Sequence, residues 1–170
     1  MGGTMTVGIT RKASASFTRP SDTNTYTIND EVSNDVDQAD AVAMTFSNVV
    51  GLPSGAGYVV GGKLVVSGDT VAAGSFRLWL YTVAPTMVGD QNGYGLLNTL
   101  REELIGYLDF SLETEDTTAG NTAVAFNHSS RIPFQNTADR HLYGALVAEA
   151  AFVASSAQTF YAELIIEGND

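Results

Sequence analysis

Cysteine is absent from the 170-residue chain, so neither a disulfide bond nor a thiolate nucleophile or thiolate metal site is available to it. Basic residues are scarce as well: eight lysines and arginines face nineteen aspartates and glutamates, which gives a formal net charge of −11. Such a chain repels phosphate backbones, and no basic stretch with interleaved aromatic residues offsets the charge. We therefore expect no nucleic-acid partner.

Long hydrophobic runs are also missing. The longest apolar stretch, residues 142–154, is interrupted by Glu149 and is shorter than the roughly 20 apolar residues that a transmembrane helix needs. Residues 1–7 contain no basic region followed by an apolar run, so we expect no secretory signal. The sequence predicts no membrane insertion.

The residues that are present favour strands. Charged residues make up only 16% of the chain, there are 17 glycines, and threonine, serine, valine and alanine dominate the remainder. This composition is typical of strands separated by turns of small residues. Strands are predicted where apolar residues alternate with polar ones, at residues 5–9, 13–18, 41–46, 58–67, 75–83, 105–110, 122–126, 142–153 and 160–167.

Many short strands without alternating helices predict an all-β fold: a single β-sandwich, jelly-roll-like, with at most one short helix. The one helical turn is expected at residues 98–104, and the Gly61–Gly62 pair is expected to form a bulge within a continuous strand. No linker divides the chain. We expect one domain over residues 12–170, preceded by a flexible N-terminal arm at residues 1–11.

Catalytic patterns are not found. His128 and His141 lie thirteen positions apart without an acidic or histidine partner at ligand spacing, which excludes the paired-histidine pattern of a cupin-type metal site. No Gly-x-Ser-x-Gly motif or phosphate-binding loop is present. The sequence therefore predicts a protein that is not an enzyme and has no cofactor and no metal site.

An acidic segment and a set of aromatic residues each allow two interpretations. The carboxylates of residues 30–40 are interpreted as a solvated loop, although alternate carboxylates and amides also suit calcium. Aromatic residues on predicted strands indicate core or interface positions, or a shelf that binds sugar rings. These aromatic residues are Tyr58, Trp79, Tyr81 and Tyr107.

Residues 18–26 read Thr-Arg-Pro-Ser-Asp-Thr-Asn-Thr-Tyr. This segment resembles the Thr-Arg-Pro-x-Asp-Thr-x-x-Tyr signature of small virion-associated proteins of tailed phages. Further matches follow in the same order at residues 76–81, 90–93, 105–110, 132–134 and 142–146. The chain departs from the pattern at residues 27–30, where Thr-Ile-Asn-Asp replaces the usual alanine and glycine before the valine.

The resemblance implies a structural role in the virion, as a decoration (cement) protein on the outside of a phage head. The implied partners are the major capsid protein and further copies of this chain, with a homotrimer preferred. The implied location is the outer surface of the head, after synthesis in the host cytoplasm. The alternatives are a carbohydrate-binding protein or another structural component of the tail or neck.

The signature also has a physical interpretation. Pro20 restricts Arg19 to extended geometry and ends the preceding strand, while Asp22 can accept backbone N–H groups in an Asx-type turn. Tyr26 is expected to plug the loop against the sandwich, and Arg19 to clamp a nearby carboxylate. This corner is interpreted either as purely structural or as a place where Arg19 reaches a neighbouring subunit. The predicted interface residues are Arg19, Tyr26, Trp79 and Tyr81.

Overall fold

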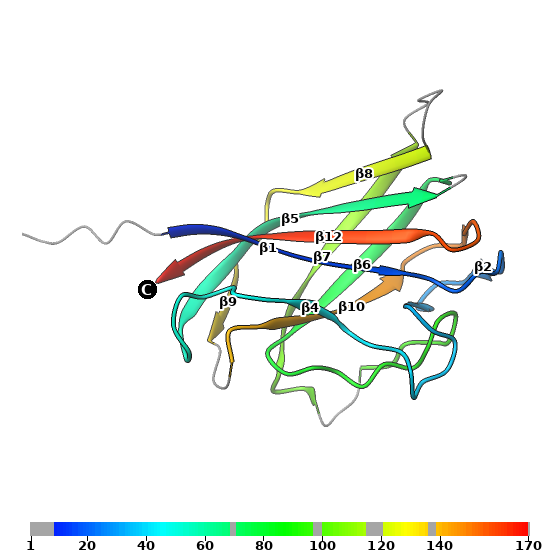
Figure 1. Cartoon of the computed structure of the whole chain (residues 1–170). Helices are drawn as coiled ribbons and strands as arrows, with labels where there is room; N and C mark the ends of the chain where they lie inside the picture. Colours follow the sequence, from blue (N-terminus) through cyan, green and yellow to red (C-terminus); the bar gives the residue numbers. More distant parts are fainter. Residues whose placement is uncertain (1–8, 69–70, 97–99, 115–120, 136–138, 170) are drawn as a thin grey trace, which may run out of the picture.

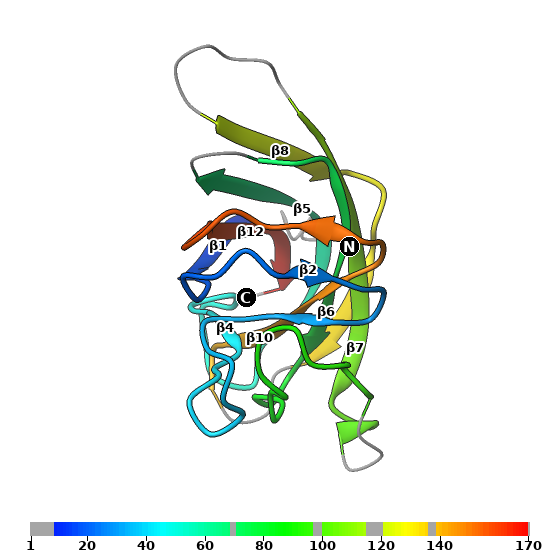
Figure 2. The same ribbon diagram turned by 90° about the vertical axis from the view of Figure 1, so that its right-hand side faces the viewer.

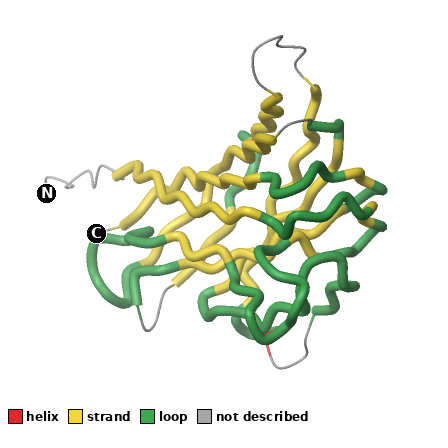
Figure 3. The backbone as a smooth tube through the Cα atoms, turned by 45° about the vertical axis from the view of Figure 1, so that its right-hand side comes forward, coloured by secondary structure: helices red, strands yellow, loops and turns green. Residues whose placement is uncertain are grey.

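The computed structural model describes residues 9–68, 71–96, 100–114, 121–135 and 139–169, and it confirms the all-β prediction. Figure 3 shows strands and loops throughout this part, apart from a 3₁₀-type turn at Leu100. No helix in it is long and apolar enough to cross a membrane. The strands are β1 (Ile9–Thr18), β2 (Thr25–Tyr26), β3 (Glu31–Val32), β4 (Met44–Phe46), β5 (Ala56–Gly68), β6 (Gly74–Tyr81), β7 (Leu104–Thr114), β8 (Asn121–Asn127), β9 (Ile132–Gln135), β10 (Leu142–Ala148), β11 (Phe152–Val153) and β12 (Thr159–Asn169).

The strands form a jelly-roll sandwich. Strands β1, β12, β5 and β8 lie side by side in one layer (Figure 1), and β7, β6 and β10 form the second, with β3 and β4 paired to β10. Pairing is nested and antiparallel: β1 pairs with β12, β4 with β10, β5 with β8, and β6 with β7. This order is that of two Greek keys rolled together. The predicted jelly roll is therefore confirmed.

Strand β7 connects the two layers. It pairs with β6 along most of its length, and its last residues pair with β8. Figure 2 shows β7 running along one side of the molecule towards β8. A small separate sheet of β2 and β11 lies at one end of the sandwich.

The core lies between the layers and follows the predicted alternation. On β6, Phe76, Leu78 and Leu80 are buried, and on β12 the residues at alternate positions from Phe160 to Ile166 are buried. Phe160 is central to an aromatic group: it stacks on Phe17 at 5.5 Å between ring centroids and meets Phe76 edge-on at 5.7 Å. Burial of these side chains stabilises the sandwich without disulfides.

The predicted bulge in β5 lies next to the glycine pair. Ile165 pairs with Gly61 whereas Ile166 pairs with Val59, so Val60 is the extra residue. A Cβ atom on Gly61 would lie 2.5 Å from the Asn127 carbonyl oxygen. Only glycine fits at this position, and the bulge bends β5 between its partners β8 and β9.

Three boundary predictions need correction. β1 begins at Ile9, so residues 9–11 pair with β12 and do not belong to an arm. Residues 1–8, including most of the predicted strand 5–9, lie outside the described residues. β4 covers only Met44–Phe46, and Val42, expected on the buried face, is 60% exposed. The predicted strand 142–153 is two strands, because the chain bends at residues 149–150 between β10 and β11.

The predicted helical turn is only partly described. Asn98 and Thr99 lie outside the described residues, and residues 100–103 form a turn closed by a hydrogen bond from Glu103 N to Leu100 O at 3.1 Å. Leu104 already belongs to β7.

Candidate functional site

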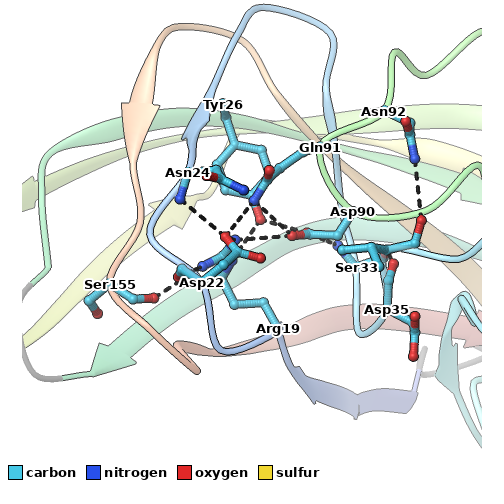
Figure 4. A network of polar contacts seen from close by, with 11 residues as sticks. Arg19, Asp22, Asn24, Tyr26, Ser33, Asp35, Asp90, Gln91, Asn92 and Ser155 are labelled. Carbon is cyan, nitrogen blue, oxygen red and sulfur yellow. Dashed lines mark hydrogen bonds and ion pairs between the residues drawn. The ribbon is translucent and has the colours of Figure 1, made fainter.

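The loop that follows β1 and the loop that follows β6 meet around one buried arginine, Arg19 (Figure 4). The Arg19 backbone N–H still bonds Gln158 O at 2.9 Å, as in the β1–β12 ladder, and Pro20 then ends the strand. The chain turns at residues 22–24, where Asn24 N–H donates to Asp22 Oδ1 at 3.1 Å. This is the Asx-type turn that the sequence predicts.

The guanidinium of Arg19 uses all five of its N–H donors. Nε donates to the Tyr26 hydroxyl at 2.7 Å. Nη1 donates to the carbonyl oxygens of Asp22 at 2.7 Å and Ser155 at 3.2 Å. Nη2 bridges two carboxylates, Asp22 Oδ1 at 2.7 Å and Asp90 Oδ2 at 3.1 Å. Although burial opposes it, the hydrogen bond that Arg19 donates to Asp22 and the charges nearby hold the pKa of Arg19 above its ordinary value, so the side chain stays charged.

Asp90 is the second centre of the network. Its Oδ1 accepts the Tyr26 hydroxyl at 2.5 Å and Ser33 N–H at 3.0 Å, and both the Arg19 and Asp90 side chains are wholly buried. Gln91 extends the network, because its amide donates to Asp22 Oδ1 at 2.8 Å. Burial and the Asp90 charge raise the pKa of Tyr26, so the phenol remains a hydrogen-bond donor. We call Arg19, Asp22, Tyr26, Asp90 and Gln91 the corner network.

Glu31 ties the same loop to β3. It was expected in a solvated acidic loop, which is wrong, since its side chain is fully buried. Its carboxylate accepts Val88 N–H at 2.7 Å and Gly89 N–H at 3.1 Å. Gly89 has a φ of 94°, and a Cβ there would lie 2.5 Å from Val36 O. The glycine therefore lets the loop lie directly against the Val36 carbonyl in a left-handed conformation.

Burial raises the pKa of Glu31, although hydrogen bonds from Val88, Ser33 and Gly89 oppose the shift. A group whose pKa is higher in the folded than in the unfolded state contributes to stability while it is protonated. This contribution is lost as the pH rises through the folded-state pKa. We therefore expect the free energy of unfolding of the wild type, relative to Glu31→Gln, to fall as the pH rises from the ordinary glutamate value of 4.5. Urea unfolding at a series of pH values measures this difference.

Glu163 provides the matched control. Despite slight burial, the hydrogen bond from Lys12 and the charge of Lys63 lower the pKa of Glu163. The free energy of unfolding of Glu163→Gln should therefore depend on pH differently from that of the wild type only below 4.5, the ordinary glutamate pKa. If the difference in free energy of unfolding between wild type and Glu31→Gln stays constant as the pH rises above 4.5, burial does not raise the pKa of Glu31.

The predicted interface residues fall into two groups. Arg19 and Tyr26 come together as predicted, and Tyr26 plugs the loop with no exposed surface. Tyr81, paired through its hydroxyl with that of Tyr94 at 2.7 Å, is only 2% exposed. All three side chains are buried within their own chain.

Trp79 is the partly exposed member of the predicted set. It lies on the outer face of β6, opposite Tyr107 on β7, with the two rings edge-on at 5.1 Å between centroids. Arg77 lies against both rings, with its Cζ atom 4.1 Å from the Tyr107 centroid and 5.3 Å from that of Trp79. This packing fixes an arginine and two aromatic side chains on a rigid sheet, a composition enriched in binding surfaces.

Carboxylates of the acidic loop accept hydrogen bonds from backbone N–H groups two or three positions away. Asp30 accepts Thr27 N–H at 2.6 Å, Asp35 accepts Asp37 N–H at 2.9 Å, and Asp37 accepts Ala39 N–H at 3.0 Å. Among the described residues, no three histidine, aspartate or glutamate side chains are grouped so as to hold a metal ion. The carboxylates of this loop therefore act as turn-forming groups.

No protein-family model, curated protein or solved structure matches the chain. Its function is therefore inferred from the residues and their arrangement. The sequence pattern pointed to Arg19, Asp22 and Tyr26 but missed Asp90 as their partner. The available signal was that residues 90–93 also belong to the ordered set of matching motifs.

Proposed function

We propose that the protein is a decoration protein of a tailed-phage head, which binds the outside of the assembled shell and stabilises it by bridging coat subunits. The observation that carries the proposal is the corner network. It joins the signature segment, through Arg19, Asp22 and Tyr26, to a second matching motif that contains Asp90 and Gln91. Arg19 and Asp90 lie 71 positions apart in the sequence. The resemblance thus concerns residues that together build one structural unit.

Fold and charge support the same assignment. Jelly rolls are a recurrent architecture of viral capsid proteins, although fold alone does not imply function. The net charge of −11 disfavours the DNA side of the shell and favours the outer side. Burial of the corner network fixes the loops at one end of the sandwich, so the protein can dock as a rigid body.

The protein would stabilise the shell because its binding is thermodynamically linked to shell assembly. A protein that binds the assembled shell but not separate coat subunits lowers the free energy of the assembled state. At a free concentration of one hundred times Kd, the stabilisation per site is about 2.7 kcal/mol. We expect a homotrimer on local three-fold axes, because closed symmetric assemblies match the symmetry of the shell. Sedimentation equilibrium of the purified protein measures this state.

Purified protein added to undecorated heads of the phage that encodes it should bind at a fixed ratio to coat subunits and raise the melting temperature of the heads. Fluorescent labelling gives the ratio, and scanning calorimetry gives the melting temperature. Heads that already carry the protein are the control and should take up none. Saturable binding without a change in head melting would refute the cementing role, and absence of binding would refute decoration.

A further inference from the structure

A hollow of about 390 Å³ lies on the outer surface of β6, β7 and β8, and Arg77 of the Arg77–Trp79–Tyr107 group is one of its lining residues. Its size falls within the roughly 300–1,000 Å³ of small-molecule sites. The side chains that line it come mostly from strands, which hold binding groups more firmly than loops do. They include Ser75, Arg77, Asp109, Ser111, Phe126 and Glu149.

Charges of both signs alternate in this hollow. Arg77 Nε and Nη2 donate to the two carboxylate oxygens of Asp109 at 2.7 and 3.1 Å, and Nη1 lies 3.5 Å from Glu149 Oε1. An anionic ligand would meet two carboxylates, and a cationic ligand would meet the guanidinium. The Asp109 side chain is 53% exposed, so its remaining lone pairs are open to a ligand. The hollow therefore suits an uncharged ligand that both donates and accepts hydrogen bonds.

One wall of the hollow is aromatic. Phe126 is 58% exposed, and its ring stacks on His128 with 5.4 Å between centroids and 14° between planes. The stack holds the free face of Phe126 in a fixed orientation at the surface. An exposed, flat apolar face next to polar groups matches the two sides of a pyranose ring, whose C–H groups form an apolar face and whose hydroxyls lie around its edge.

We propose that this hollow binds a neutral sugar residue of a glycan. The ring stacks on Phe126, and its hydroxyls donate to Asp109 and Glu149 and accept from Arg77 and the serine hydroxyls. Phe126 is not among the aromatic residues from which a sugar shelf was expected. Of those, Tyr81 is buried and Trp79 is half-buried, whereas Tyr107 is 44% exposed with the Arg77 guanidinium against its ring. The proposal does not depend on head binding.

The test is an NMR titration of the ¹⁵N-labelled full chain with four neutral probes: the methyl glycosides of glucose, mannose, galactose and N-acetylglucosamine. At least one should shift backbone signals of β6, β7 and β8 around the hollow in a saturable way. Phe126→Ala should weaken that binding about tenfold, equivalent to about 1.4 kcal/mol. Leu52→Ala, which removes another exposed apolar side chain, is the matched control and should leave the affinity unchanged.

Methylguanidinium and acetate separate the rival ligand classes, and thermal melts of each variant confirm that it is folded. Saturable shifts with a glycoside that are lost in folded Phe126→Ala support the sugar site. Shifts with methylguanidinium or acetate in place of the glycosides, or no shift with any of the four probes, overturn it. Equal affinity of wild type and Phe126→Ala also overturns it.

Discussion

Replacing Asp90 by alanine is expected to lower the free energy of unfolding by about 3–5 kcal/mol. The substitution leaves the buried charge of Arg19 without the carboxylate that lies 3.1 Å from its Nη2 atom. It also removes the acceptor of the Tyr26 hydroxyl and of Ser33 N–H. Because small domains are typically stable by only about 5–15 kcal/mol, this is a large fraction of the total. Urea unfolding followed by circular dichroism measures it.

The exposed pair Arg77–Asp109 is the matched control for this prediction, since its bonds are as short but its carboxylate faces solvent. Asp109→Ala should cost about 0–1 kcal/mol. The double variant Arg19→Met with Asp90→Leu should be more stable than Asp90→Ala, because it also removes the buried charge of Arg19, which would otherwise keep only Asp22 as a carboxylate partner. Equal losses for Asp90→Ala and Asp109→Ala would mean that the corner network is not the anchor of these loops.

Phe160→Ala is expected to lower the free energy of unfolding by about 3–5 kcal/mol. The Phe160 side chain is fully buried between the layers and contacts the rings of Phe17, Phe76 and Phe152. Alanine leaves a cavity that both strands β1 and β6 would have to move to fill. The measurement is again urea unfolding.

The same substitution at the exposed Phe126 is the control, because it removes the same atoms from the surface and should change stability by no more than about 0.5 kcal/mol. A loss at Phe160 as small as that at Phe126 would contradict the placement of the core between β1, β6 and β12.

The fold was largely predictable because the sandwich repeats one local rule. Phe76, Leu78 and Leu80 alternate with Arg77 and Trp79, and the structure buries the first set. The Gly61–Gly62 pair marked the place of the bulge, since Val60 next to it is the extra residue and a Cβ on Gly61 would clash with the Asn127 carbonyl oxygen. The rule fails at Tyr81, which alternation places outside but which is buried, because the β6–β7 loop folds over the outer face and packs Met87 against it.

The corner was predictable only where its contacts are local. Pro20, Asp22 and Tyr26 lie within seven positions of Arg19, so turn chemistry suggested a clamp and a plug. Asp90 joins them from another loop, and Glu31 is buried by that loop's approach to β3. Neither fact has a local signal, because both depend on how the layers bring distant segments together.

Cryo-electron microscopy of phage particles with and without this protein tests the proposed head decoration most directly. A head decoration protein should give density for a β-sandwich on the outer surface of the head shell, at repeated symmetry-related positions, in particles that carry it. That density should be missing from particles made without it. Density at the tail or neck, or shells that are identical in the two preparations, would contradict head decoration.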